Sequence, residues 1–430
     1  MSVAAPFAAP VWCSTPGMAG AEGLASHSGA DLLGAPTTPV RIALAGCGTV
    51  GSALARQLVA HGAPGGREVR LVSVLVRHAE RARGCAIPAG TLTTSPERFL
   101  ATPADIVVET LGGIEPALRI VRASLRAGRR VVTANKTLIA AHGASLAALA
   151  VQSRATLDFE GAVGGGIPVV RALRSGAAGV RVQAIRAVLN GTSTFVLGRA
   201  LCGVSMDDAV RDAQARGFAE AIPDRDLDGL DAADKIAILA WLAFRVAPHM
   251  LLVQRRPLDD AVALAPVAAA LGCATRQLAE VVLTSAGLVA SVEPALVSRS
   301  HALGRTEDEW NTVSIESASA GTIVLSGPGA GGDATAGALY ADIGHGSAPL
   351  PLPTVARVAA RDERQLAWIV LTRAGDAVVL GAGGERCRAE GSALGGAAMH
   401  VLVATRDEVA TLCGQLRATG EAPAFARDLR

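Results

Sequence analysis

The chain has 430 residues, a formal net charge of +2 at pH 7, and hydrophobic side chains at 50% of its positions. This composition is typical of a globular protein with more than one buried core, and it excludes a disordered scaffold. Without a dense basic run, neither nucleic acid nor an acidic membrane surface is an expected partner, and a small-molecule substrate fits better.

The seven cysteines are scattered and form no CxxC pair, so we expect neither a disulfide framework nor a zinc site, and we expect a cytoplasmic protein. Residues 1–39 contain no lysine or arginine, unlike a secretory signal or transit peptide, and are interpreted as a flexible tail. The two longest apolar stretches, 236–244 and 261–273, are shorter than the roughly 20 residues of a membrane-spanning helix.

Lysine is almost absent from the chain. Lys136 and Lys235 are the only two, and the other basic residues are arginine. Arginine replaces lysine wherever a solvated cation suffices, but not where an amine has to lose its proton near neutral pH. Both lysines are therefore candidate functional residues. The alternative is that they are remnants on a solvated surface.

The first predicted element is a buried-type strand at 40–45, followed by a glycine-rich turn and a helical pattern. In this turn Gly46 permits a tight bend, Gly48 lets a pyrophosphate approach the backbone, and Gly51 allows the helix to pack closely. Strand, glycine turn and helix together favour a dinucleotide site over a plain glycine-rich turn.

The second strand is expected at 69–76 and is followed by Arg77, with Arg81 and Arg83 nearby. A cofactor with a free ribose hydroxyl usually meets an acidic residue at this point, and none stands here. A 2′-phosphate could bind Arg77 instead, which favours NADP(H) over NAD(H). A solvated arginine is an equally good interpretation.

Further strands are expected at 106–109 and 130–133, with a helix at 116–127 between them. This alternation predicts an α/β fold with a Rossmann-type doubly wound parallel sheet. The glycine-rich segment 160–168 breaks the pattern and is interpreted as the hinge to a second domain. There we expect a strand at 182–189, several helices through about residue 283, and a strand-rich stretch around 311–325. A strand at 399–404 and a helix at 406–419 are expected near the C-terminus.

The most informative segment is 217–235, where six carboxylates precede one lysine. Asp231 and Lys235 are four residues apart at the start of a predicted helix, so they share one helical face. Apolar residues follow Lys235, so desolvation would lower the pKa of its amine while the carboxylates would raise that pKa. Such opposed effects suit proton transfer. The alternative is a solvated helix start with an ordinary salt bridge.

Several blocks between about residues 41 and 342 resemble the homoserine dehydrogenase family in order and spacing. They are Gly46-x-Gly-Thr-Val-Gly, Glu109-Thr-Leu-Gly-Gly, Ala134-Asn-Lys, 160–168, Asn190-Gly-Thr, 217–235 and Gly327-x-Gly-Ala-Gly-Gly-Asp-Ala-Thr-Ala. The resemblance implies the NAD(P)-dependent interconversion of L-homoserine and L-aspartate 4-semialdehyde, for threonine and methionine biosynthesis, by a homodimer.

By this resemblance, Lys235 is the amine that exchanges a proton with the substrate oxygen, and Lys136 is a second catalytic amine beside the nicotinamide. The implied substrate-binding residues are Glu220, Asp226, Asp231 and Thr192. The implied cofactor-binding residues, which join Arg77, are Gly46, Gly48, Thr49, Val50, Gly51, Thr110, Lys136, Gly329 and Gly331.

The loop at 160–168 resembles the family's monovalent-cation site. There the Glu160 side chain and main-chain oxygens of Val163, Gly165 and Ile167 would bind sodium or a similar ion. The alternative is a glycine-rich hinge without an ion.

Four parts of the chain are expected: the tail at 1–39; a dinucleotide-binding domain at 40–165, completed by about 326–345; an α+β substrate-binding and dimerisation domain at 166–325; and a short, degenerate ACT-like unit at 350–430. This last unit lacks the Asp-x-Pro-Gly turn of a regulatory ACT domain, so we do not expect feedback control by threonine.

Two other departures from the family pattern are Phe218 in place of a tyrosine and Ile222 in place of an acid. Together with the altered C-terminal unit, they motivate the first of two alternative functions. One is a paralogous oxidoreductase acting on a related amino-acid alcohol or aldehyde. The other is a catalytically silent nucleotide sensor, against which the presence of both lysines argues.

Overall fold

The structure, a computed structural model, describes residues 38–81, 83–176, 179, 181–216, 219, 223–345, 349–354, 357–359, 362–373, 397–418 and 424–429. The predicted tail, apart from its last two residues, lies outside the described residues, and so do Phe218, Glu220 and Ile222. None of the helices in these ranges is long and apolar enough to cross a membrane.

The first sheet has six parallel strands in the order β3-β2-β1-β4-β5-β6. This is the Rossmann order, and it confirms the predicted doubly wound sheet. The strands are β1 (Val40–Ala45), β2 (Val69–Leu75), β3 (Leu92–Thr93), β4 (Ile106–Glu109), β5 (Arg130–Thr133) and β6 (Leu157–Asp158).

Strand β1 supplies hydrophobic side chains to both faces of this sheet. Ile42 and Leu44 enter one core cluster, Ala43 and Ala45 enter the other, and all four are fully buried. After exposed Arg41, residues 42–45 form a run without polar side chains, as a strand covered on both faces requires. Ala45 is in register with the last residues of β2 and β4, so these three strands end together at one edge.

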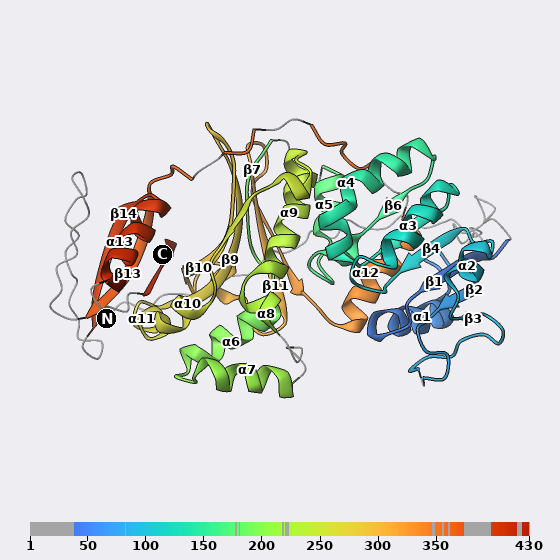
Figure 1. The fold of residues 1–430 in the computed structure, drawn as a ribbon, viewed down its shortest axis with the longest axis horizontal. Helices are drawn as coiled ribbons and strands as arrows, with labels where there is room; N and C mark the ends of the chain where they lie inside the picture. Colours follow the sequence, from blue (N-terminus) through green and yellow to red (C-terminus); the bar gives the residue numbers. More distant parts are fainter. Residues whose placement is uncertain are drawn as a thin grey trace, which may run out of the picture. The chain divides into compact units, whose positions relative to one another are not determined.

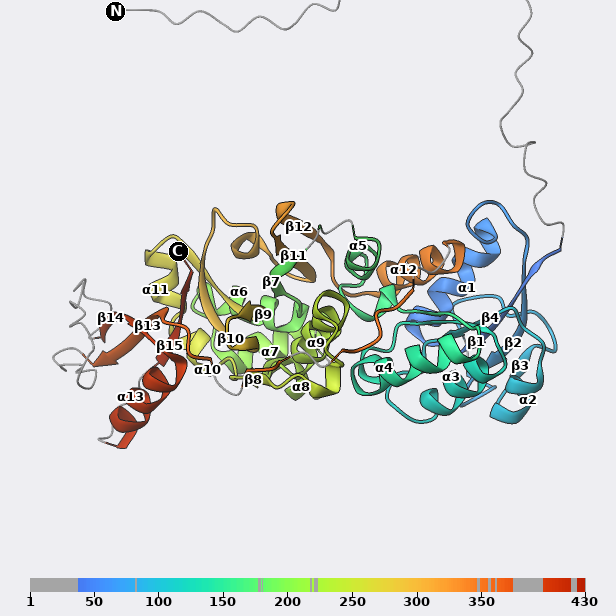
Figure 2. The same ribbon diagram turned by 90° about the horizontal axis from the view of Figure 1, so that it is seen from above.

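The helices of this domain are α1 (Thr49–His61), α2 (Pro96–Ala101), α3 (Ala117–Arg126), α4 (Lys136–Gln152) and, from late in the chain, α12 (Gly332–Gly344). Helix α12 lies alongside α1 in both views (Figures 1 and 2). Arg56 of α1 pairs with Asp333 at 3.2 Å. At the other end of α12, the Arg130 guanidinium donates to the main-chain oxygen of Ile343 at 3.1 Å and to those of Asp342 and His345.

The second sheet is mixed, with the path β12-β11-β7-β9-β10-β15-β13-β14 and β8 paired with β10. Its strands are β7 (Val182–Val188), β8 (Val253–Arg255), β9 (Cys273–Thr284), β10 (Gly287–Ser298), β11 (Trp310–Ser317), β12 (Gly321–Pro328), β13 (Leu366–Arg373), β14 (Ala397–Ala404) and β15 (Ala424–Leu429). The helices nearby are α5 (Val169–Arg174), α6 (Gly191–Leu201), α7 (Met206–Ala215), α8 (Asp224–Leu227), α9 (Leu230–Phe244), α10 (Asp259–Ala263) and α11 (Ala265–Ala270).

The expectation of helices through about residue 283 is wrong, because helix ends at Ala270 and residues 273–284 form β9. Strands β9 and β10 pair antiparallel along their whole length. The first nine residues of β9 are buried, polar ones included. With both faces covered, the alternation of polar and apolar residues that marks a strand is lost.

The C-terminal part contributes β13, β14, helix α13 (Arg406–Ala418) and β15, close to the expected strand and helix. Strand β15 pairs with β10, so these strands extend the second sheet. The ACT-like character of the C-terminal part stays a prediction, and so do the bounds of the four predicted parts of the chain.

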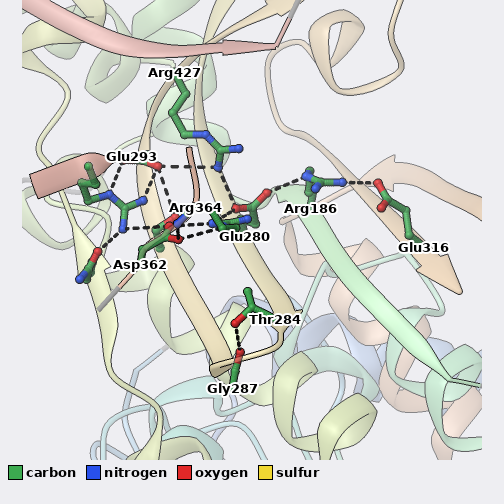
Figure 3. A network of polar contacts seen from close by, with 12 residues as sticks. Arg186, Glu280, Thr284, Gly287, Glu293, Glu316, Asp362, Arg364 and Arg427 are labelled. Carbon is green, nitrogen blue, oxygen red and sulfur yellow. Dashed lines mark hydrogen bonds and ion pairs between the residues drawn. The ribbon is translucent and has the colours of Figure 1, made fainter. Parts of the chain in front are cut away.

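Buried Glu280 of β9 accepts from Arg186 at 2.6 Å, from Arg364 at 2.8 Å and from Arg427 of β15 at 2.7 Å (Figure 3).

Helix α4 of the first domain packs against helix α9 of the second. The ring of Trp241 on α9 stacks on Phe159 with 5.7 Å between centroids and an interplanar angle of 13°. Gly143 of α4 allows this approach, since a Cβ there would lie 2.9 Å from the Trp241 ring. This contact fixes α4, which begins at Lys136, against α9, which carries Lys235.

Candidate active site

The glycine turn connects β1 to α1 as predicted. Gly46 has a φ of +97°, and a Cβ there would lie 2.7 Å from the Thr110 main-chain oxygen. A Cβ on Gly51 would lie 2.3 Å from the Gly46 main-chain oxygen. Gly48 is the N-cap of α1 and has open space around it, so a phosphate can approach the helix N-terminus. The turn therefore fits a dinucleotide pyrophosphate.

A cavity of about 700 Å³ opens at this turn. Of the predicted cofactor residues, Gly46, Gly48, Thr49, Arg77 and Thr110 line it, whereas Val50 packs against the core cluster under α1. The arginines on its walls are Arg56, Arg77, Arg81 and Arg83.

The four arginines differ in their contacts. Arg83 donates to the main-chain oxygens of Ala79 at 3.0 Å and Arg81 at 2.6 Å, and so holds its own loop together. Arg56, which sequence reasoning missed, donates to the Gly84 main-chain oxygen at 3.2 Å in addition to pairing with Asp333. The concentration of positive charge makes the cavity suited to a ligand with several phosphates.

A second cavity, of about 820 Å³, holds both lysines. Predicted site residues from both domains line it, namely Lys136, Thr192, Asp226, Asp231, Lys235, Gly329 and Gly331. Gly329 and Gly331, predicted to meet the cofactor, thus lie in the cavity of the two amines. Other residues on its walls, which sequence reasoning did not assign to the site, include Asn135, Asn190, Arg216, Arg225 and Glu309.

Asp231 lies between the two lysines. Its Oδ2 is 2.8 Å from Lys235 Nζ, and its Oδ1 is 2.5 Å from Lys136 Nζ. Lys235 also donates to the Leu189 main-chain oxygen at 2.6 Å. Asp231 and Lys235 are buried, and the Lys136 side chain is 39% exposed.

These contacts give the two amines different acidities. Burial lowers the pKa of Lys235, the neighbouring Lys136 lowers it further, and Asp231 opposes both without reversing the shift. Burial also lowers the pKa of Lys136, but attraction to Asp231, Asp226 and Asp234 outweighs it and the net pKa is raised. Burial raises the pKa of Asp231, yet the two ammonium groups bring it below its usual range. Lys235 is therefore the amine more ready to lose its proton.

Asn190 joins the carboxylates of this cavity. Its Nδ2 donates to Asp226 Oδ1 at 2.8 Å and to Asp231 Oδ2 at 3.0 Å, while its Oδ1 accepts from Ser193 N at 2.8 Å and caps α6. Thr192 donates through Oγ1 to Asp226 Oδ2 at 3.0 Å. The α6 N-terminus thus holds Asp226 in place, and this residue brings a carboxylate into the cavity.

Buried Glu109 at the end of β4 organises the opposite wall. Its Oε2 accepts from Thr133 Oγ1 at 2.5 Å, and its Oε1 accepts from Leu111 N at 2.7 Å. Asn135 donates through Nδ2 to the Gly113 main-chain oxygen at 2.6 Å and caps α4, whose next residue is Lys136. Burial raises the pKa of Glu109. Glu109 is the first residue of one of the sequence blocks that resemble the family, but the sequence predicted no role for it.

Glu160 lies outside both cavities. Its Oε1 accepts from Val170 N at 2.9 Å and its Oε2 from Arg171 N at 2.8 Å, so the carboxylate caps α5. Burial first, and then Asp342 nearby, raise the pKa of Glu160 to about 7. The described residues contain no group of three or more His, Cys, Asp or Glu side chains able to hold a metal ion. A cation here would depend on the main-chain oxygens of the loop.

Oxidation of an alcohol requires a hydride acceptor and a group that takes the hydroxyl proton. The glycine turn accommodates the first, and the neighbouring cavity supplies the buried amine of Lys235 for the second, so the fold and the site define a dinucleotide-dependent dehydrogenase.

Comparison with known proteins identifies the family. Two family models match: the NAD-binding domain of homoserine dehydrogenase over residues 46–160 and homoserine dehydrogenase over residues 168–343. A homoserine dehydrogenase of Synechocystis is 36% identical over 317 residues, 71% of this chain and 72% of the relative. One of Corynebacterium glutamicum is 35% identical over 329 residues, 72% of each chain.

Solved structures agree with this result. A homoserine dehydrogenase from Thiobacillus denitrificans has a TM-score of 0.80 at 28% identity, over 91% of this chain and 98% of its own. A hyperthermophilic archaeal homoserine dehydrogenase in complex with NADPH has a TM-score of 0.62 at 28% identity, over 71% of this chain and 97% of its own.

The chain belongs to the homoserine dehydrogenase family. Its reaction is the NAD(P)-dependent interconversion of L-homoserine and L-aspartate 4-semialdehyde.

Proposed function

We propose that Lys235 exchanges the proton in this reaction. A nicotinamide cofactor, when bound, takes hydride from the substrate carbon or returns it. In oxidation the neutral Lys235 amine takes the hydroxyl proton of homoserine, and in reduction its ammonium form protonates the forming alkoxide. The observation that carries this proposal is the position of Lys235 Nζ, held by Leu189 and Asp231 at the wall of the cavity with its pKa lowered.

Lys136 has the complementary role in this proposal. Because its pKa is raised, it keeps its positive charge at neutral pH. A fixed cation in a partly desolvated cavity stabilises negative charge that develops on the substrate oxygen. Its position as the first residue of α4 also brings it within reach of the nicotinamide end of a cofactor bound at the glycine turn.

The substrate ammonium group needs carboxylates that are not neutralised by the lysines. Asp226 supplies one, because its side-chain hydrogen-bond partners in the described part of the chain, Asn190 and Thr192, are neutral donors. Asp231 contributes chiefly by holding both lysines. Glu220, outside the described residues, stays part of the proposal through the family resemblance alone.

For the cofactor we propose NADP(H) in preference to NAD(H). The support is the group of arginines around the first cavity, including Arg77 just after β2. Among the described residues on its wall, the one carboxylate is that of Asp333, which is paired to Arg56. A free ribose hydroxyl would favour an acid beside β2, whereas a 2′-phosphate favours guanidinium groups.

A monovalent cation at the Glu160 loop is a further part of the proposal. Gly164 and Gly165 have positive φ values, which suits a loop that turns its main-chain oxygens inward, and buried Glu160 adds negative charge. Both Glu160 oxygens already accept main-chain hydrogen bonds, so the carbonyls would do most of the ligation. Homoserine oxidation in sodium, potassium or choline chloride at equal ionic strength tests this; equal rates in all three would contradict it.

We propose a homodimer formed through the second domain, in the cytoplasm and in threonine and methionine synthesis. Exposed hydrophobic side chains on three strands of that domain support an interface there: Leu283 of β9, Trp310 of β11 and Val324 of β12. Light scattering on the purified chain measures its mass directly, and a monomer at assay concentration would contradict the dimer.

The decisive experiment follows cofactor reduction with L-homoserine, using NADP and NAD in parallel, for wild type and Lys235→Ala. We expect turnover in wild type, loss of roughly a thousandfold or more in the variant, and retained NADPH binding. Arg126→Ala, an exposed change on α3, is the control. Full activity of Lys235→Ala would contradict the proposed proton transfer; cofactor binding without turnover in wild type would favour the nucleotide sensor.

A further inference from the structure

The main-chain oxygen of Leu189 accepts from two side chains. Lys235 Nζ donates to it at 2.6 Å and Asn311 Nδ2 donates to it at 3.2 Å. Leu189 directly follows β7 and precedes Asn190, the cap of α6. Lys235 comes from α9 and Asn311 from β11, so three separate elements meet at this one carbonyl group.

Asn311 is held firmly where it makes this contact. It is 1% exposed, and β11 pairs on one side with β7 and on the other with β12, where Asn311 lies opposite Gly327. Gly329 packs directly against its amide, because a Cβ on Gly329 would lie 2.0 Å from Asn311 Cγ. The same Gly329 lines the cavity of the two lysines.

The orientation of the amide is determined by its neighbours. Turning it over would bring Asn311 Oδ1 against the Leu189 oxygen, so two acceptors would face each other. In the orientation observed, Oδ1 is buried and has no hydrogen-bond partner among the described residues. The side chain therefore acts on the site through its NH₂ group.

We propose that Asn311 is a positioning residue for Lys235, which acts by sharing and orienting the Leu189 carbonyl that holds the lysine amine. This inference rests on the proposed proton transfer by Lys235. Asn311 itself contacts neither substrate nor cofactor in this scheme. It also connects the Gly329–Gly331 loop to the lysine, since Gly329 packs against its amide.

Sharing the carbonyl affects the protonation of Lys235. An ammonium group donates more strongly than a neutral amine, so an acceptor stabilises the charged form. A carbonyl oxygen that already accepts a hydrogen bond from Asn311 is a weaker acceptor for the ammonium group, and so stabilises the charged form less. Removing the Asn311 donor should therefore raise the pKa of Lys235, and homoserine oxidation, which needs the neutral amine, should require a higher pH.

Asn311→Leu tests the proposal, because leucine has the same number of side-chain heavy atoms and the same branch at Cγ but donates no hydrogen bond. The measurement is kcat/KM for L-homoserine against pH at saturating NADP, together with NADPH binding by fluorescence. We expect the acidic limb to move to higher pH by about half a unit to one unit, kcat near neutral pH to fall by roughly three- to tenfold, and the NADPH Kd to stay within about twofold.

Thr312→Val is the matched control. Thr312 is the next residue of β11, equally buried, and its hydroxyl bonds to Thr306 and Ser326 rather than to the Leu189 region. Its acidic limb should coincide with that of wild type. If Asn311→Leu does not fold, Asn311→Ala replaces it. Alanine also lacks the donor and adds no charge, so the acidic limb should move in the same direction.

An acidic limb that stays in place, or moves to lower pH, overturns the role of Asn311. A shift of the same size in Thr312→Val also overturns it, because the effect would then be one of general packing. Lys235→Met separates this inference from the proposed function. If Lys235→Met is inactive and the Asn311 variants keep the wild-type limb, only the inference fails; if Lys235→Met is active, the proposed function fails.

Discussion

Asp231 joins the two lysines of the chain across the domain boundary, with Lys136 Nζ 2.5 Å from its Oδ1 and Lys235 Nζ 2.8 Å from its Oδ2. One carboxylate thereby sets the distance between two amines on different helices. It also partly compensates the burial of Lys235, which without this anion would be a cation in an apolar helix.

Asp231→Asn should remove most of the activity. Without the carboxylate the pKa of both lysines falls, the ammonium groups repel each other, and their geometry is lost. We expect kcat to fall by about a hundredfold or more and the free energy of unfolding to fall by about 3–5 kcal/mol, the usual cost of breaking a buried ion pair. Steady-state kinetics and thermal unfolding measure both. Asp234→Asn is the control, because Asp234 pairs with Arg225 and this ion pair is more exposed to solvent. It should lower kcat and the free energy of unfolding much less.

The pH profile should report the lowered pKa of Lys235. Homoserine oxidation needs the neutral amine, so kcat/KM should rise with pH and level off below the pH expected for an ordinary lysine, whose pKa is about 10.4. Reduction of the aldehyde needs the ammonium form and should fall over the same range. Lys235→Arg should be inactive throughout, because a guanidinium stays protonated. An oxidation rate that does not vary between about pH 6 and 10 would contradict this assignment.

Arg77→Ala should shift cofactor preference. Removing a guanidinium from a 2′-phosphate should lower kcat/KM for NADP by about ten- to a hundredfold and leave the value for NAD within about threefold. Parallel assays with the two cofactors measure the ratio. An equal loss of kcat/KM with both cofactors would mean that Arg77 supports the loop after β2 and does not bind the 2′-phosphate.

An amine-directed acylating reagent should inactivate the enzyme by modifying few positions, since the chain has two lysines and one N-terminus. Exposure favours Lys136, whose side chain is 39% exposed against 10% for Lys235. Acylation needs the neutral amine and the pKa of Lys136 is raised, so its modification should become faster as the pH rises. Peptide mass spectrometry identifies the modified residue, and bound NADPH should slow its modification. Complete acylation of Lys136 with full activity would refute a catalytic role for that residue.

The buried cluster around Glu280 should make the free energy of unfolding depend on pH in the acidic range. Burial raises the pKa of this carboxyl, but three arginines outweigh that effect and hold it at about 2. The unfolded value is near 4.3, so the stabilisation is complete above about pH 4.5 and is lost as the pH falls towards 2, by about 3 kcal/mol.

Urea unfolding from pH 7 to 2.5 measures this dependence. Glu280→Gln should be less stable at pH 7 and should lose less further stability in acid. Glu316→Gln is the control, since Glu316 pairs with Arg186 but is 39% exposed. Parallel pH curves for wild type and Glu280→Gln would show that the cluster does not titrate as described.

Local sequence determined those features that depend on near neighbours. The strand, glycine turn and helix at 40–61 follow from hydrophobic runs and from glycines whose Cβ would clash. Asp231 and Lys235 pair because they are one helical turn apart. Because the chain has only two lysines, the sequence alone predicts that both are functional residues. Periodicity failed at β9, where burial on both faces removes the alternation that identifies a strand.

Only the tertiary structure decided which distant residues meet. The contact between α4 and α9 brings Lys136 to Asp231, and the pairing of β11 with β7 brings Asn311 to the carbonyl that holds Lys235. Arg56 of α1 meets Asp333 only because α12 returns to the first domain from late in the chain. Such contacts depend on how buried surfaces fit together across the whole fold, and a short stretch of sequence does not contain that information.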